Sequence, residues 1–279
     1  MTKLEYTFKS DTLFKMLFVQ HPDLLRRLVS ELLRIRHESI EQFEITNPEM
    51  PPESLSGKFC RLDINMIVDG QRVNLEIQVH DQGDYPERAL FHWARVYSTA
   101  LPRGKDYLEL PRTVIISIVD FCLFECAEYH SEFQPLEVTR HEPLSDRMSL
   151  HFFELRKLPA EIRREDMLLL WLSLFNAETE EELGQISLLE VPVMEQAISA
   201  YRRITVTPEF KEAARLRELA QHNEASALRH EREQERKIWQ NVVADKDAAI
   251  ADKDAAIADK DAENERLRKE LAELRAELG

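Results

Sequence analysis

The feature that most limits the fold of this chain is a pair of alternating polar and apolar runs joined by Asp69-Gly70, within residues 59–79 (FCRLDINMIVDGQRVNLEIQV). Asp-Gly between two such runs is a strong signal for a two-residue β-hairpin turn. If these two residues form the turn, antiparallel pairing continues outward until Asp63 lies opposite Glu76. The sequence therefore predicts the hairpin together with its register.

Alternation also sorts the hairpin into an apolar face and a polar face. On the polar face Asp63 and Glu76 would oppose each other, with their Cβ atoms roughly 5 Å apart, and like charges so placed destabilise a strand pair. A bound Mg²⁺ or Mn²⁺ would remove that conflict, because hard cations prefer carboxylate oxygens. A solvated polar face without metal is the alternative interpretation. The apolar set is Leu62, Ile64, Met66, Val68, Val73, Leu75, Ile77 and Val79, and the polar set is Asp63, Asn65, Asn74, Glu76 and Gln78.

Other short motifs accompany the hairpin along the chain. They are Asp11-Thr12-Leu13-Phe14-Lys15, Leu62-Asp63-Ile64, Leu75-Glu76-Ile77-Gln78, Glu87-Arg88-Ala89-Leu90, Ala94-Arg95-Val96-Tyr97-Ser98 and Gly104-Lys105-Asp106-Tyr107. In this order they resemble the Rpn family, the bacterial recombination-promoting nucleases and transposases of the PD-(D/E)XK nuclease superfamily. The resemblance covers about residues 5–205. Its most specific part is the Glu-Ile-Gln strand with the Arg-to-Tyr helix after it.

This resemblance implies a metal-dependent DNA endonuclease of low sequence specificity, a hydrolase that promotes recombination by breaking phosphodiester bonds. It implies Asp63, Glu76 and Gln78 as catalytic residues. It also implies a Mg²⁺ ion, for which Mn²⁺ can substitute, bound by Asp63, Glu76 and the carbonyl of Ile77. Gln78 stands where the signature usually has Lys, so it supplies no positive charge, but its amide can orient water or bind a phosphate oxygen.

Four further residues are candidates for additional site groups or phosphate contacts. Asp11 and Lys15 match the family's first motif and lie one helical turn apart, although such a pair can also be an ordinary surface ion pair. Arg88 and Arg95 lie on the helix expected from Pro86 onward, from which they can reach a phosphate backbone.

The order of predicted elements indicates an α/β fold, a restriction-endonuclease-like mixed sheet flanked by helices. Residues Thr113–Phe121 form a near-continuous apolar run, which is typical of a central strand covered on both faces. Further strands are expected at Phe133–Val138 and Ser149–Leu155. We expect a nuclease-like core over 1–158, a helical appendix over 159–206, and a long helix over 207–279.

The last segment contains the heptad Ala-Asp-Lys-Asp-Ala-Ala-Ile, repeated from Ala244. A period of seven is typical of a coiled coil, which would make the chain a homo-oligomer or bind a partner helix. A solvated single helix is the alternative, because Asp, Glu and Lys can support each other along a helix. One register contains Val243, Ile250, Ile257, Asn264, Leu271 and Leu278, in which Asn264 favours a parallel two-stranded pairing.

Composition limits the function further. The net charge of −15 argues against a general surface for nucleic acid, so DNA binding would depend on local basic groups and bound metal. Three cysteines, no signal peptide and no apolar run of membrane-spanning length favour the cytoplasm. Glycine-rich phosphate loops and acyl-transfer nucleophile motifs are absent. Two alternatives stay open, a catalytically weak nuclease-fold protein that acts as a coiled-coil assembly or binding module, and a nuclease that acts on RNA.

Overall fold

The computed structural model describes residues 2–47, 63–101, 104 and 106–277. The chain separates into two compact units, Met1–Ala220 and Gln221–Gly279, and each is described here by itself. Leu62, Lys105 and Leu278, which entered the expectations above, lie outside the described residues.

The first unit is organised around a mixed sheet with the strand order β1-β2-β3-β4-β6-β5 among the described residues. The β1/β2, β2/β3 and β5/β6 pairs are antiparallel, whereas β4 runs parallel to both of its neighbours, β3 and β6. The strands are β1 (Phe43–Ile45), β2 (Ile64–Val68), β3 (Gln71–Gln78), β4 (Thr113–Val119), β5 (His130–Phe133) and β6 (Met148–Glu154).

The predicted hairpin is confirmed as β2 and β3, with Ile64 opposite Leu75 as the expected register requires. Asp69 and Gly70 have φ angles of 47° and 78°. Two consecutive left-handed residues match the primed turn that suits the twist of a tight hairpin. The Asp69 carboxylate also accepts hydrogen bonds of 2.8 Å from the backbone N–H groups of the two residues before β1. The turn therefore also anchors the neighbouring strand.

The apolar face of the hairpin is buried as expected, from Ile64 on β2 to Leu75 on β3. Val79 departs from the prediction, because it is 36% exposed. The reason is that β3 ends at Gln78, so Val79 no longer follows the alternation of the strand.

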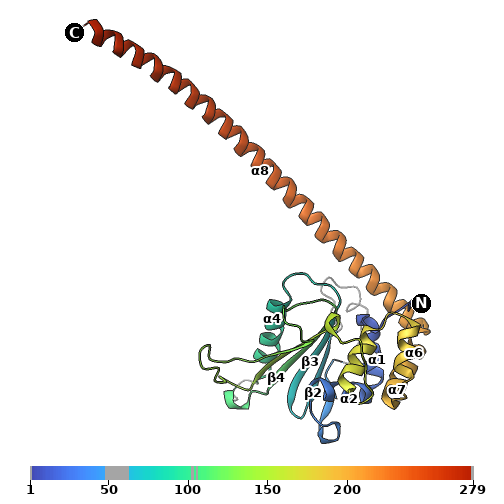
Figure 1. Ribbon diagram of the computed structural model, residues 1–279. Helices are drawn as coiled ribbons and strands as arrows, with labels where there is room; N and C mark the ends of the chain where they lie inside the picture. The colour runs from blue at the N-terminus through green and yellow to red at the C-terminus, as the bar shows by residue number, and fades with distance from the viewer. Residues whose placement is uncertain (1, 48–62, 102–103, 105, 278–279) are drawn as a thin grey trace. The chain divides into compact units, whose positions relative to one another are not determined.

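Helices cover both faces of the sheet, and Figure 1 shows α4 on one side and α1 and α2 on the other. The face with α1 and α2 also receives side chains of α5, α6 and α7 in one large core, while α4 forms a smaller core with the opposite face. The helices are α1 (Asp11–Gln20), α2 (Pro22–Leu32), α4 (Tyr85–Ser98), α5 (Met167–Asn176), α6 (Glu180–Ser187) and α7 (Pro192–Thr205), with 3₁₀ turns at His37–Ser39, Tyr107–Glu109 and Leu155–Lys157.

The central strand is confirmed, since every residue of β4 is buried between the two helical layers. The strand expected at Phe133–Val138 is wrong, because β5 is His130–Phe133 and ends where that prediction began. Pro135 gives the physical reason, since proline has no N–H group to donate to a strand ladder. The last strand, β6, agrees with the expected position to within one residue at each end.

The helices of residues 159–206 complete the same core as the sheet. Trp171 and Phe175 of α5 lie against Phe18 of α1, with ring centroids 6.1 and 6.2 Å apart. Tyr201 of α7 stacks on Phe8 at 4.7 Å. These aromatic contacts connect α5 to α1 and α7 to the segment that precedes α1.

The second unit is part of α8 (Pro208–Glu277), a helix of 70 residues. The helix begins after Thr207, whose hydroxyl accepts a hydrogen bond of 3.2 Å from the Phe210 N–H. Apolar side chains of the second unit are exposed, including Ile250 at 56% and Ile257 at 57%. In the part of the chain that the structure describes, no helix is both long and apolar enough to pass through a bilayer.

Candidate active site

Two carboxylates occupy the polar face of the hairpin, on the side covered by α4. Asp63 directly precedes β2, and extending the Ile64–Leu75 pair by one residue places it opposite Glu76 of β3. Glu76 is only 7% exposed, so its charge lies in a largely dry environment. Asp63 is half-buried, and both carboxylates have partners, as charges withdrawn from water require.

The Asp63 carboxylate is held by two side-chain amides. Its Oδ2 accepts hydrogen bonds from Asn65 Nδ2 at 3.1 Å and from Asn74 Nδ2 at 2.5 Å. Asn74 also donates to Asn65 Oδ1 at 3.0 Å, which fixes the orientation of its amide. Asn74 Oδ1 is buried and has no hydrogen-bond partner among the described residues. An oxygen acceptor without a donor therefore lies beside Asp63.

Glu76 is held by the helix that covers it. The Tyr85 hydroxyl at the start of α4 donates a hydrogen bond to Glu76 Oε1, and His92 Nδ1 lies 3.9 Å from Oε2. Burial raises the pKa of Tyr85 well above its ordinary value, and the Glu76 carboxylate raises it further. The hydroxyl consequently remains a donor at neutral pH and orients Glu76.

These groups fit a hard divalent cation. The Asp63 and Glu76 carboxylates and the orphaned Asn74 Oδ1 are oxygen donors of the kind that Mg²⁺ takes. Ile77, whose backbone carbonyl was expected to be a third metal ligand, lies opposite Ile118 in the β3/β4 strand pair. Among the described residues, His, Cys, Asp and Glu form no group of three or more suited to a metal ion, so the protein's ligands here would be few. Mg²⁺ usually keeps several waters, which suits such a sparse site.

Gln78, which stands in the usual place of Lys, is paired with an arginine. Its Oε1 accepts a hydrogen bond of 2.9 Å from Arg88 Nη2, and its Nε2 donates to the His80 carbonyl at 2.9 Å. The Arg88 guanidinium also lies over the Tyr85 ring, 4.7 Å from the ring centroid. A fixed positive charge therefore lies next to the uncharged Gln78, delivered by α4 instead of β3.

The structure brings Lys15 to the hairpin and gives Asp11 another partner. Lys15 is 4% exposed, and its Nζ donates to the Asp63 backbone carbonyl at 3.4 Å. Asp11 Oδ2 instead lies 2.6 Å from Arg217 Nε, in an ion pair between α1 and the first part of α8. Arg95 is exposed on α4, about two turns beyond Arg88.

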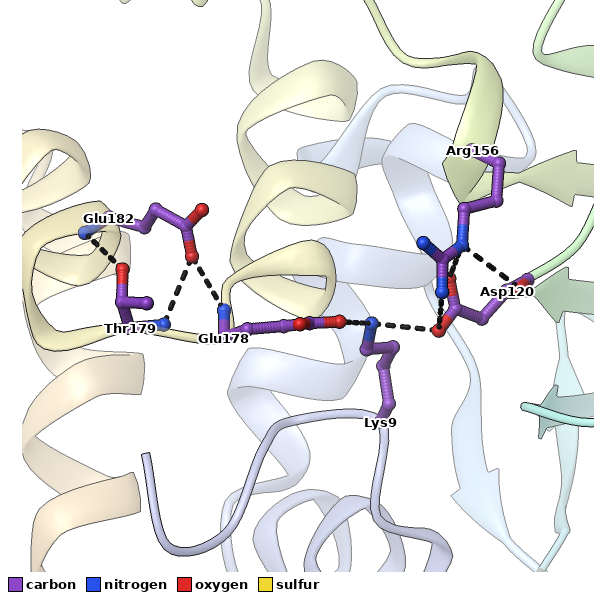
Figure 2. A network of polar contacts seen from close by, with 6 residues as sticks. All are labelled: Lys9, Asp120, Arg156, Glu178, Thr179 and Glu182. Carbon is purple, nitrogen blue, oxygen red and sulfur yellow. Dashed lines mark hydrogen bonds and ion pairs between the residues drawn. The ribbon is translucent and has the colours of Figure 1, made fainter. Parts of the chain in front are cut away.

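A network of charges next to the site, centred on the buried pair Lys9 and Asp120, was not expected from the sequence. Asp120 directly follows β4, and its backbone N–H donates to the Gln78 carbonyl at 2.9 Å. Figure 2 shows the Asp120 carboxylate between Lys9 and Arg156, with Lys9 Nζ 2.8 Å from Oδ2 and Arg156 Nε 2.6 Å from Oδ1. Lys9 also reaches Glu178 Oε1 at 2.7 Å. These pairs fasten the end of the sheet at Gln78 to the N-terminal segment and to the residues just before α6.

The same network continues into the start of α6. The Thr179 hydroxyl accepts from the Glu182 N–H at 3.3 Å, and Glu182 Oε2 accepts from the Glu178 N–H at 2.7 Å (Figure 2). The hydrogen bond from Lys9 lowers the pKa of Glu178.

The sequence contained one indication of this network. Asp120 ends an otherwise apolar run, and a buried carboxylate requires partners. Its partner Lys9 lies 111 positions away, so spacing alone does not reveal it.

Comparison with known proteins agrees with this geometry. No curated protein and no solved structure matches the chain. The profile of one family, described as PD-(D/E)XK nuclease family transposase, matches residues 8–231. The match contains the complete sheet and both carboxylates, and the mixed sheet with flanking helices is consistent with a restriction-endonuclease-like α/β fold. The chain thus belongs to the PD-(D/E)XK nuclease family transposases.

Proposed function

We propose that this protein is a metal-dependent DNA endonuclease with little sequence preference, which promotes recombination by breaking DNA in the cytoplasm. The observation that carries the proposal is the pair of opposed carboxylates, Asp63 and Glu76, beside the orphaned Asn74 Oδ1. Opposed like charges cost stability, and a divalent cation offsets that cost. The exposed free thiols of Cys122 and Cys126 are compatible with a reducing compartment.

A divalent ion bound by Asp63, Glu76 and the Ile77 carbonyl would lower the pKa of a bound water and polarise the scissile phosphate. The chain's own residues hold the ligands in place. Asn65 and Asn74 bind one oxygen of Asp63, so the other is left for a ligand, and Tyr85 orients Glu76 from the opposite direction. Preorganised ligands of this kind lower the reorganisation needed during the reaction.

Gln78 and Arg88 together replace the lysine of the usual signature in this proposal. The Gln78 amide orients water or a phosphate oxygen, while Arg88 supplies the positive charge that Gln78 lacks. Arg95, which is exposed on α4, contacts phosphates of the bound strand, while the buried Lys15 supports the site by binding the Asp63 backbone carbonyl. Asp11 contributes indirectly in this arrangement, because its ion pair with Arg217 fixes α1.

The first experiment is cleavage of supercoiled plasmid by the full-length protein with Mg²⁺, with Mn²⁺ and with chelator. Asp63→Asn and Glu76→Gln remove one charge each and preserve side-chain size. We expect metal-dependent cutting that both variants lose. Glu44→Gln is the matched control, because Glu44 is an exposed strand carboxylate on β1. Absence of metal-dependent cutting above the background of the two variants, on DNA and on RNA, would contradict the proposal.

A charge exchange tests the pairing of Gln78 with Arg88. Arg88→Gln should lower cleavage strongly, since it removes the only charge in that pair. Adding Gln78→Lys to the same chain should restore part of the rate, because the charge then returns on β3. If Gln78→Lys gives no recovery while both variants remain folded, the role assigned to Arg88 is wrong.

The substrate strand is proposed to be DNA, and parallel assays on RNA of the same sequence test that choice.

The second unit supports a further part of the proposal, a parallel homodimer formed by a coiled coil. Val243, Ile250 and Ile257 lie seven residues apart and are 53%, 56% and 57% exposed, so an isolated helix leaves this stripe in water. Sedimentation of the full chain should show a dimer that Ile250→Lys with Ile257→Lys disrupts.

If sedimentation finds the unchanged chain monomeric across the concentration range, the dimer is excluded and the solvated single helix is correct. If the dimer forms and the plasmid assay shows no cleavage, the chain acts as an assembly module. The two measurements are therefore independent of each other.

A further inference from the structure

A polar cavity lies on the face of the sheet away from α4, between the end of α2 and the strands β3 to β6. Its volume is about 100 Å³, several times the ~10–15 Å³ that one water needs by a comparable measure. Side chains alternate along β6, so Ser149 and His151 face this cavity while Leu150 and Phe152 pack with α4 on the other face. Polar groups around it are Arg34, Gln71, Arg112, His130, Glu132 and His151.

Four hydrogen bonds form one directed chain along the wall of this cavity. Arg34 Nη2 lies 3.4 Å from His130 Nδ1, and His130 Nε2 lies 3.1 Å from His151 Nδ1. His151 Nε2 is 2.9 Å from the Ser149 hydroxyl, which donates to Glu132 Oε1 at 2.9 Å. Arginine only donates, so His130 accepts at Nδ1, and the remaining donors follow in the same direction. This order requires both imidazoles to be neutral.

The burial of the two histidines, together with the arginines near them, agrees with this protonation. Burial and the neighbouring Arg34 lower the pKa of His130. Burial lowers the pKa of His151 to about 4, with His130, Arg112 and Arg34 acting in the same direction and Glu132 opposing them. Two guanidinium groups, Arg34 and Arg112, and one carboxylate, Glu132, line the cavity, so its lining has an excess of positive charge.

Arg112 has no partner that would explain its position. Among the residues that the structure describes, its guanidinium makes no side-chain hydrogen bond or ion pair, and its Nε is buried without a partner. Glu132, the nearest candidate, already accepts hydrogen bonds at Oε1 from Ser149 and from Gln134 Nε2, the latter at 2.7 Å. Arg112 is half-buried and its Nε–H has no acceptor, so a complementary anion at this position would satisfy that donor.

We propose that this cavity binds a phosphate group through the half-buried Arg112 and the exposed Arg34. Guanidinium groups bind tetrahedral oxyanions through paired N–H donors, and two of them face this small space. The shared chemistry is a phosphate dianion, which inorganic phosphate and the terminal phosphate of a nucleic acid strand both supply. Because the cavity and Glu76 lie on opposite faces of the sheet, this site is separate from the proposed nuclease site.

The test is titration of the full-length protein with inorganic phosphate, followed by calorimetry and by NMR of the histidine ring protons. We expect saturable binding and an upward shift in the pKa of His130 and His151, because a bound dianion offsets the charge of Arg34 and Arg112. Arg112→Gln should weaken binding about tenfold or more, which corresponds to about 1.4 kcal/mol for a lost charge-assisted hydrogen bond. Arg163→Gln is the matched control, since Arg163 is 71% exposed and pairs with Glu161.

Arg34→Gln provides a second variant in case Arg112→Gln fails to fold, because Arg34 is exposed at the end of α2. It should also weaken phosphate binding, whereas Glu76→Gln should leave it unchanged. An oligonucleotide with a 5′-phosphate, compared with its 5′-hydroxyl form, distinguishes a strand end from free phosphate as the source. Absence of saturable binding by both probes, or equal binding by the wild type and the folded arginine variants, would overturn the proposal.

Discussion

The two units of this chain use the same kinds of side chain under opposite conditions. In the first unit Ile64 and Ile116 are fully buried at 0%, whereas in the second unit Ile250 and Ile257 are more than half exposed. The side chains of ion pairs also differ in exposure between the two units. The Lys9–Asp120 side chains are 5% and 3% exposed, and those of Arg266 and Glu270 are 82% and 54% exposed.

This difference shows that the type of a residue does not by itself determine how much its side chain contributes to the stability of the fold. Burial removes apolar surface from water, which is the main favourable contribution to folding, and it strengthens electrostatic interactions by excluding solvent. The first unit has both effects. The second unit has neither as an isolated helix, so its stability depends on backbone hydrogen bonds, local pairs and, in our proposal, a second copy.

Replacement of a buried isoleucine tests the contrast most strongly. Ile116→Ala in β4 should lower the free energy of unfolding of the first unit by about 2–5 kcal/mol, because it leaves a cavity in a packed core. Ile250→Ala should change that quantity by less than about 0.5 kcal/mol. Urea unfolding monitored by tryptophan fluorescence measures both. Similar losses in the two variants would contradict the contrast between the units.

Buried and exposed histidines should differ in the pH dependence of stability. The pKa of His151 falls from 6.5 to about 4 on folding, so its stabilising contribution is complete above pH 6.5 and is lost as the pH falls toward 4. The loss amounts to about 3 kcal/mol at most. His151→Gln should flatten this part of the stability profile, whereas His230→Gln, in the exposed helix, should leave it unchanged. An unaltered profile in His151→Gln would assign the dependence to other groups.

The buried network should show a smaller effect. Lys9→Met removes one partner of Asp120 but leaves the ion pair with Arg156, so we expect a loss of about 1–3 kcal/mol. Thermal unfolding at low and high salt measures it, and screening should change the result little because the pair is buried. A loss that disappears at high salt would mean that the pair is open to solvent.

The smallest effect is expected for the exposed pair of the second unit. Arg266→Gln should change helix stability by at most about 0.5 kcal/mol, because solvent and salt screen its contact with Glu270, 3.5 Å away. Circular dichroism at 222 nm as a function of temperature is the appropriate measurement. A change as large as that of Lys9→Met would remove the distinction between buried and exposed pairs.

The sequence was most informative where structure is decided by neighbouring residues. Asp69 and Gly70 determine the turn, the alternation on either side determines the faces, and both follow from local chemistry. The positions of Asp63, Glu76 and Gln78 on one face of the hairpin were predictable for the same reason, and their catalytic role stays a prediction. The position of Arg88 near the hairpin was also predictable, because the helix that carries it follows the hairpin directly in the chain.

Contacts between distant segments were not predictable. The strand order β4-β6-β5 brings His130 beside His151, and no local pattern specifies which strands become neighbours. The partners of Asp120 come from the N-terminal segment and from the end of β6, and the orphaned oxygen of Asn74 is recognisable only once Asp63 is in place. These three features depend on how distant segments pack together, which local sequence patterns do not specify.

The two-residue turn of the hairpin has a consequence for the order of folding. Closing so short a loop costs little chain entropy, and hairpins form in about 1–10 μs. Asp63 and Glu76 therefore meet early, before β4 and β6 pair across much longer stretches of chain. An isolated hairpin is at best marginally stable, so this early encounter lasts only when later segments arrive. We therefore expect the folding chain to bring its two candidate catalytic carboxylates together first, and α4 to add later the tyrosine that orients Glu76.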